Sequence, residues 1–93
     1  MILGRVCGTV VCTRKEESLV GLKFLIVEEL GLKDDKPTGK FVIAADSVGA
    51  GASERVLVVS GSSARLTEQT LKKPVDAAIN AIVDNVVFDS DRG

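Results

Sequence analysis

The sequence contains no histidine, no tryptophan and no tyrosine, and it has only three phenylalanines. Histidine is the commonest metal ligand and the usual general acid or base near neutral pH, so its absence argues against a metal site and acid–base catalysis. No nucleophile stands in a recognisable pattern with a base. We therefore predict no catalytic residue, no metal and no cofactor, and we expect that the protein is not an enzyme.

Long runs of one charge and long apolar runs are also missing. The chain has 12 basic and 13 acidic residues, without the basic surface that nucleic acids or anionic membranes attract. Phe24, Phe41 and Phe88 offer little surface on which bases could stack. No apolar run approaches the roughly 20 residues of a membrane helix, and the first residues (MILGRV) do not resemble a signal peptide. We expect a cytosolic protein that binds neither nucleic acid nor membrane.

Cysteine is scarce, and Cys7 and Cys12 are the only two. Their odd separation places them on opposite faces of a continuous strand, where they would neither form a disulfide nor share a metal ion. We expect both to be free and to serve as small buried apolar residues.

Apolar residues, in contrast, are abundant for a chain of 93 residues. They make up 45% of the sequence, and the nine glycines raise this to about 55%, above the usual 45–50%. A chain this short forms a single domain with a modest core. The excess therefore suggests that some apolar surface is buried between subunits.

Short runs rich in valine and isoleucine predict strands over residues 1–13, 22–28, 40–45, 55–60 and 77–83. Gly4 and Gly8 mark places where the first strand bends or another backbone approaches. Ser62 or Ser63 is suited to cap a short helix that ends before Pro74. We interpret the last run as a buried strand, and a helix starting at Asp76 is the alternative. The pattern predicts a mainly β fold, a small five-stranded OB-like β-barrel with one short helix between strands 4 and 5.

Charged and turn-forming residues separate these runs. Asp34 and Asp35 lie in such a segment, and we interpret them as a solvated turn rather than a catalytic pair. Asn80 is the one polar residue in the last apolar run and would need hydrogen-bond partners if buried. Residues 86–88 predict one more short extended piece, and residues 89–93 predict a flexible tail.

The most unusual segment is the small-residue run between the third and fourth strands. It consists of Gly49, Ala50, Gly51, Ala52 and Ser53. A phosphate-binding loop fits poorly, because the third glycine of a dinucleotide motif and the lysine of a P-loop are missing and a strand follows where both motifs need a helix. Two interpretations remain: a tight connection between strands, or a place where copies of the chain meet around an axis.

Read as a whole, the sequence resembles the EutN/CcmL family of pentameric shell proteins, which cap the vertices of bacterial microcompartments. Five blocks carry this resemblance in the right order: LGRVCGTVVCTRK (3–15), LVGLKFLIV (19–27), PTGKFVIAADSVGAG (37–51), ERVLVVSGSSAR (54–65) and PVDAAINAIVD (74–84). The chain departs from the family pattern at Ser53, which stands where the family has a glycine, at Ala45, and at Asn80, where an aliphatic residue is usual.

The resemblance implies a single vertex-protein domain over residues 1–93 that forms a homo-pentamer. It implies a structural role in the shell of a carboxysome or metabolosome in the bacterial cytoplasm, beside hexameric facet proteins. On this model residues 49–53 lie at the five-fold axis or pore. Charged residues of the matching blocks are candidates for subunit contacts: Arg5, Lys23, Asp46, Glu54, Arg65 and Asp76. An OB-type module that binds single-stranded nucleic acid or another ligand is the alternative function.

Overall fold

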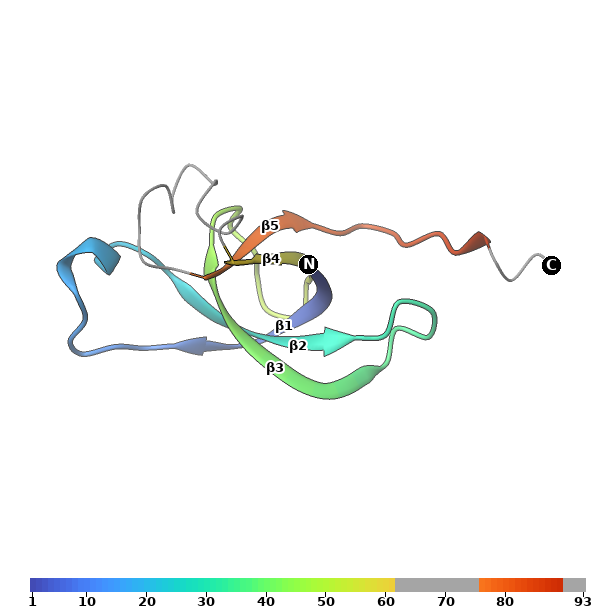
Figure 1. The fold of residues 1–93 in the computed structure, drawn as a ribbon, viewed down its shortest axis with the longest axis horizontal. Helices are drawn as coiled ribbons and strands as arrows, with labels where there is room; N and C mark the ends of the chain where they lie inside the picture. Colours follow the sequence, from blue (N-terminus) through green and yellow to red (C-terminus); the bar gives the residue numbers. More distant parts are fainter. Residues whose placement is uncertain (62–75, 90–93) are drawn as a thin grey trace.

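Five strands form a closed barrel in the computed structural model, which describes residues 1–61 and 76–89 (Figure 1). The strands are β1 (Ile2–Val10), β2 (Phe24–Leu30), β3 (Pro37–Asp46), β4 (Arg55–Ser60) and β5 (Ala77–Ile82). They pair in the order β1-β2-β3-β5-β4, and β4 pairs with β1 to close the barrel. The predicted five-stranded barrel is confirmed, whereas the predicted helix between β4 and β5 lies outside the described residues.

Small aliphatic side chains fill the barrel. Alternate residues of each strand point inward, so that Leu25 and Val27 of β2 are buried while Phe24 and Ile26 are only half-buried. Valine and alanine predominate in the core because the interior of a five-stranded barrel is narrow. The buried cluster consists of Val6, Leu25, Val27, Ala44, Ala50, Val56, Val58, Ala77 and Ile79.

Gly4 lies where β2 packs tightly against β1. A Cβ atom at this position would collide with Cγ1 of Val27 and would lie 2.9 Å from the carbonyl oxygen of Glu28. A Cβ at Gly8 would instead lie 3.1 Å from Cδ1 of Ile26, the mobile end of a side chain. The expected close backbone approach is therefore found at Gly4, and the register of β1 shifts between Val6 and Gly8.

Only β4 has the predicted boundaries; β2 spans Phe24–Leu30 and not 22–28, β5 ends one residue early at Ile82, and β1 and β3 differ more. β1 ends at Val10 because its partner Phe24 is the first residue of β2, which leaves residues 11–13 without a partner strand. β3 begins at Pro37, three residues early, because Pro37 pairs with Leu30 across an irregular step that contains Gly39 at φ 89°. A short 3-10 helix, η1 (Glu17–Leu19), lies in the charged connection between β1 and β2.

Both cysteines are exposed, so the prediction that they are buried apolar residues is wrong. Cys7 directly follows the buried Val6 in β1, so its side chain points away from the core. Cys12 lies beyond the end of β1. The prediction that both are free thiols is confirmed.

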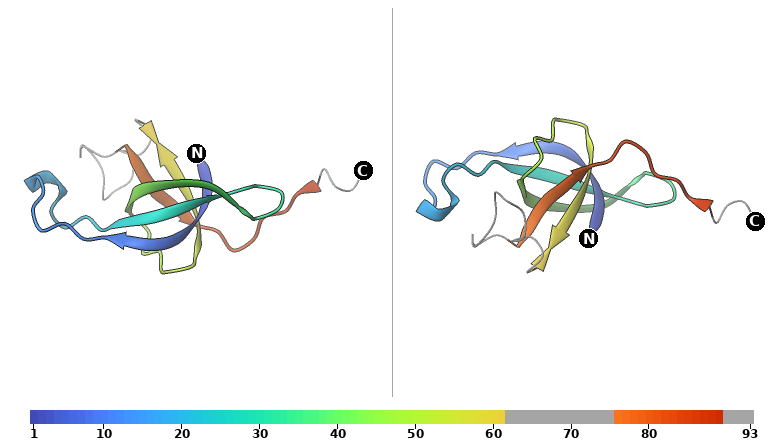
Figure 2. Two further views of the ribbon diagram at one scale, coloured as in Figure 1. Left: turned by 90° about the horizontal axis from the view of Figure 1, so that it is seen from below. Right: turned by 90° about the horizontal axis from the view of Figure 1, so that it is seen from above.

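The last apolar run is a strand and not a helix. β5 pairs with β4 from Ala77 to Ile82, and its polar residue Asn80 is exposed on the outer surface of the barrel. Residues 83–89, here called the C-terminal arm, then lead away from the barrel. Within the described residues the predicted extended piece at 86–88 joins no strand ladder. The arm and the β1–β2 connection extend from opposite ends of the barrel (Figure 2).

Candidate assembly site

The connection between β3 and β4, residues 47–54, is the β3–β4 loop that contains the small-residue run. Asp46, the last residue of β3, fixes its first half. Its Oδ1 atom accepts hydrogen bonds from the backbone N–H groups of Val48 at 3.0 Å, Gly49 at 3.0 Å and Ala50 at 3.3 Å. A carboxylate that accepts several N–H groups holds a loop in one conformation.

The second half of the loop is fixed against β1. Glu54 Oε1 accepts a hydrogen bond from the N–H of Gly51 at 2.6 Å. The N–H of Ser53 donates to the carbonyl of Val6 at 2.8 Å, and the N–H of Val6 donates to the carbonyl of Glu54 at 3.0 Å. The loop therefore continues the sheet beside β1 rather than moving freely in solvent.

Exposure divides the small-residue run in two. Ala50 is only 2% exposed and its methyl group belongs to the barrel core. Gly49, Gly51, Ala52 and Ser53 are all exposed. The exposed part of the loop therefore carries only very small side chains, while the Ala50 side chain packs in the barrel core.

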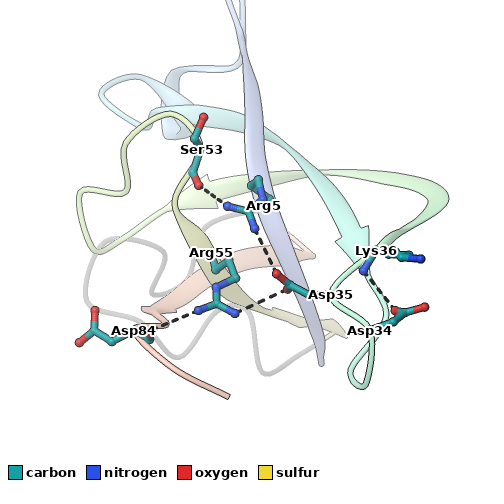
Figure 3. Close-up of polar contacts among 7 residues, drawn as sticks. All are labelled: Arg5, Asp34, Asp35, Lys36, Ser53, Arg55 and Asp84. Atoms are coloured by element: carbon teal, nitrogen blue, oxygen red, sulfur yellow. Dashed lines mark hydrogen bonds and ion pairs between the residues drawn. The ribbon is translucent and has the colours of Figure 1, made fainter. Parts of the chain in front are cut away.

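Arg5 and Arg55 lie directly opposite each other on β1 and β4, with Asp35 between their guanidinium groups (Figure 3). Asp35 forms ion pairs of 3.4 Å with Arg5 and 3.6 Å with Arg55. Like charges directly opposite on adjacent strands repel, so the shared carboxylate stabilises this pairing. Asp35 comes from the β2–β3 connection and has φ 58°, a left-handed conformation that aspartate tolerates better than most residues.

The two arginines extend this network to the rest of the barrel. Arg5 Nη1 donates to the carbonyl of Ser53 at 2.8 Å, and Arg55 Nη2 donates to the carbonyl of Asp84 at 3.1 Å (Figure 3). Asp35 therefore links the tip of the β2–β3 connection to both the β3–β4 loop and the C-terminal arm.

The described residues contain neither a cluster of metal-ligating side chains nor an unpaired buried polar side-chain atom. No group of three or more potential metal ligands occurs among residues 1–61 and 76–89. In the same residues, every buried polar side-chain atom has a hydrogen-bond partner. Within this part of the chain, no helix has the length and apolarity needed to cross a membrane.

Known proteins share both the sequence and this barrel. The family model described as "Ethanolamine utilisation protein EutN/carboxysome" matches residues 1–84. The chain belongs to the EutN/CcmL family. It is 48% identical to the carboxysome shell vertex protein CcmL of Thermosynechococcus vestitus, over 97% of this chain and 90% of that protein.

Solved structures of the EutN/CcmL family have the same fold as this chain. CcmL of Gloeobacter violaceus superimposes with a TM-score of 0.90 at 45% identity, over 96% of this chain and 91% of that one. GrpN of Rhodospirillum rubrum, a pentameric microcompartment shell protein, gives a TM-score of 0.85 at 48% identity, over 95% and 99% of the two chains. These relatives are structural shell proteins of bacterial microcompartments, so this member of the family is a shell protein and not an enzyme.

Ser53 occupies a position where glycine would have a physical advantage. Its φ is 68°, in the left-handed region, and Gly49 in the same loop has φ 76°. A Cβ atom is disfavoured in this region, whereas glycine adopts it without strain. The hydrogen bonds of the Ser53 N–H and carbonyl to β1 residues hold the serine in this left-handed conformation.

The candidate contact residues of this EutN/CcmL chain fall into three groups. Arg5, Asp46 and Glu54 form contacts within the protomer. Lys23 and Asp76 are exposed, and Lys23 lies beside the β3–β4 loop in an open pocket of about 180 Å³. Arg65 lies outside the described residues. The contribution of each to subunit contacts stays a prediction.

The sequence analysis did not identify Asp35 and Arg55 as residues that connect separate segments of the barrel. The prediction of a solvated turn is confirmed, since Asp34 and Asp35 are both exposed, but it did not include the two ion pairs of Asp35 with arginines. Asp34 alone acts locally, accepting a hydrogen bond from the N–H of Lys36 at 3.1 Å. Only the strand register places Arg5 opposite Arg55, and the register cannot be read from charges 50 positions apart in the sequence.

Proposed function

We propose that this EutN/CcmL chain forms a closed ring of five copies and that the ring caps the vertices of a polyhedral microcompartment shell. The observation that supports this most strongly is its similarity to a pentameric shell protein, at 48% identity over 95% of the chain. The exposed apolar residues on the barrel exterior, including Phe41 and Ile43, supply surface that a ring would cover.

The β3–β4 loop is suited to lie at the axis of the ring. Five identical loops converge there, so each must occupy little space and keep one conformation. Residues 49–53 have the smallest side chains available, and Asp46 and Glu54 hold their backbone in place. In this arrangement the exposed rim of Gly51, Ala52 and Ser53 borders the axial opening.

The vertex role follows from geometry. A layer of hexamers alone is flat or rolls into a tube, and five-fold units introduce the curvature that closes it. The partners of this ring are therefore hexameric facet proteins of the same shell, and the place of action is the bacterial cytoplasm. The role requires complementary surfaces on two faces of each chain, as in any cyclic ring.

Native mass spectrometry over a range of protein concentrations tests the ring. We expect a dominant species at five times the chain mass of 9.8 kDa. A species at the mass of one chain at every concentration would overturn the proposal, and so would a dominant hexamer.

A shell-closure experiment tests the vertex role separately. Facet hexamers of the same shell are produced with and without this chain and viewed by electron microscopy. We expect closed polyhedra with the chain and tubes, sheets or open shells without it. Equally closed and sealed shells in both cases would contradict the vertex role while leaving the ring intact.

A further inference from the structure

One edge of β3 is open along half of the strand. β3 pairs with β2 from Pro37 to Ala45, but it pairs with β5 only at Ala45 and Asp46. Within residues 1–61 and 76–89, the segment 40–44 therefore has no strand on its second side. An exposed strand edge is a template for pairing with another chain. Its two outward side chains, Phe41 and Ile43, are 60% and 55% exposed.

A cleft of about 250 Å³ lies beside this open edge, where β3 diverges from the ends of β1, β4 and β5. Its floor is apolar, with Val58 and Ala77 buried and Ile2 and Val42 half-buried, and Glu29, Lys40, Phe41 and Ser60 complete its lining. A strand placed along segment 40–44 would cover the cleft.

The C-terminal arm has the properties of such a strand. Its residues Val86, Val87 and Phe88 favour β structure, yet they join no ladder in the described part of the chain. Phe88 faces its own β2–β3 connection, with Lys33 Nζ 5.8 Å from the ring centroid. Side chains alternate along an extended chain, so Val87 faces the other way, and it is 74% exposed.

We propose that the cleft beside β3 binds the C-terminal arm of a second copy of this chain, with Val87 of the neighbour over the apolar floor. The proposal rests on the proposed ring and names the contact that joins its neighbours. The cleft and the arm are different surfaces of one chain, as a cyclic ring requires.

Charge and rigidity favour this occupant over another protein. The arm contains the acidic residues Asp84 and Asp89. The open edge has the basic residues Lys36 and Lys40 at its start, and one acidic residue, Glu29, also lines the cleft. The arm is also held in place by its own barrel, through Arg55 at the carbonyl of Asp84 and Lys33 at Phe88. A segment that is already ordered loses little conformational freedom on binding. The charged tip of the β1–β2 connection lacks such an apolar run.

Substitution of Val87 by aspartate tests the contact in the full chain. Val87 is exposed in the protomer, so the barrel is expected to fold normally, while a carboxylate over an apolar floor opposes binding. We expect the protein concentration at which half of the rings dissociate to rise at least tenfold for Val87→Asp and for Phe41→Asp. The matched control Val11→Asp, at a valine that is 86% exposed, should leave that concentration unchanged.

The wild-type chain tests the proposed ring, and Val87→Asp tests the arm contact independently of it. If it is monomeric at all concentrations, the proposed ring fails. If it forms rings and Val87→Asp forms them equally well, the ring stands and the arm contact is wrong.

Cross-linking identifies the two surfaces directly. Both native cysteines are replaced by serine, one preparation receives Val87→Cys and another Phe41→Cys, and the two are mixed and oxidised. A disulfide between residues 41 and 87 can then form only between copies. We expect mixed dimers, identified by mass, as the main product at protein concentrations that favour rings. Their absence beside rings of normal mass would overturn the proposal.

Discussion

At the scale of single residues, Gly4 shows how closely β1 and β2 pack. We expect Gly4→Ala to lower the free energy of unfolding by about 1–3 kcal/mol, because its Cβ would meet the Val27 side chain and a backbone carbonyl. Gly8→Ala is the matched control on the same strand. It should be nearly neutral, because Ile26 can move its terminal methyl and alanine restricts the unfolded chain. Urea denaturation of both variants checks this, and equal losses would contradict it.

Asp35 is the residue whose charge holds two opposed arginines together. We expect Asp35→Asn to lower stability by about 1 kcal/mol, because Arg5 and Arg55 then repel each other without a counter-charge. Asparagine tolerates φ 58° as well as aspartate does, so the change isolates the charge.

The neighbouring change Asp34→Asn removes one charge from the same turn and serves as the control. Its effect on urea denaturation should be small at low salt. The loss for Asp35→Asn should shrink at about 1 M salt, where surface charges are screened beyond roughly 3 Å. A loss that is independent of salt would show that the carboxylate acts through shape and not charge.

At the scale of elements, two nearby residues of the β3–β4 loop are expected to serve different processes: Ala50 stabilises the folded protomer, and Ala52 affects assembly of the ring. Ala50→Leu is expected to destabilise the protomer by about 1–3 kcal/mol, since the alanine methyl lies in the core. Ala52→Leu is expected to leave the protomer folded but to weaken the ring, because its side chain is exposed at the proposed axis. Circular dichroism with native mass spectrometry distinguishes the two. Normal rings from Ala52→Leu would place the loop away from the axis.

The strands could be predicted from the sequence because β propensity and the residue preferences of turns are local properties of the sequence. β4 was predicted to the residue, and β5 was correctly interpreted as a strand. The start of β3 was missed because Gly39 at φ 89° permits an irregular step that restores pairing with Leu30. Such a step depends on the partner strand and leaves no local signal.

The candidate site was predictable only in part, for the same reason. The small-residue run identifies the β3–β4 loop in the sequence. Asp46 and Glu54 are predicted to contact neighbouring subunits, and the sequence does not indicate that they also accept hydrogen bonds from the loop itself. A charged residue beside a glycine-rich run is as suited to bind its own backbone as to bind a neighbour, and only coordinates decide between them.

At the scale of the whole molecule, assembly and stability should be linked. A ring binds folded chains and not unfolded ones, so mass action raises the apparent stability with protein concentration. We expect the melting temperature to rise by several degrees over a hundredfold increase in concentration. Calorimetry measures this, with Val87→Asp as the comparison, whose melting temperature should depend less on concentration. A melting temperature that is constant over this range for the wild-type chain would argue against a reversible ring.

The short parallel pairing between β3 and β5, here called the seam, affects when the barrel can close during synthesis of the chain. Only two residue pairs, Ala45 with Ala78 and Asp46 with Ile79, join these strands, and the Ser47 hydroxyl adds a hydrogen bond to the carbonyl of Ile79. The seam connects segments that are 33 positions apart, and β5, the last strand of the chain, fills the place between β3 and β4. Until β5 is synthesised, the barrel remains an open sheet with its core exposed to water. We expect copies to meet as finished barrels and not as growing chains, so the timing of shell closure is set after translation.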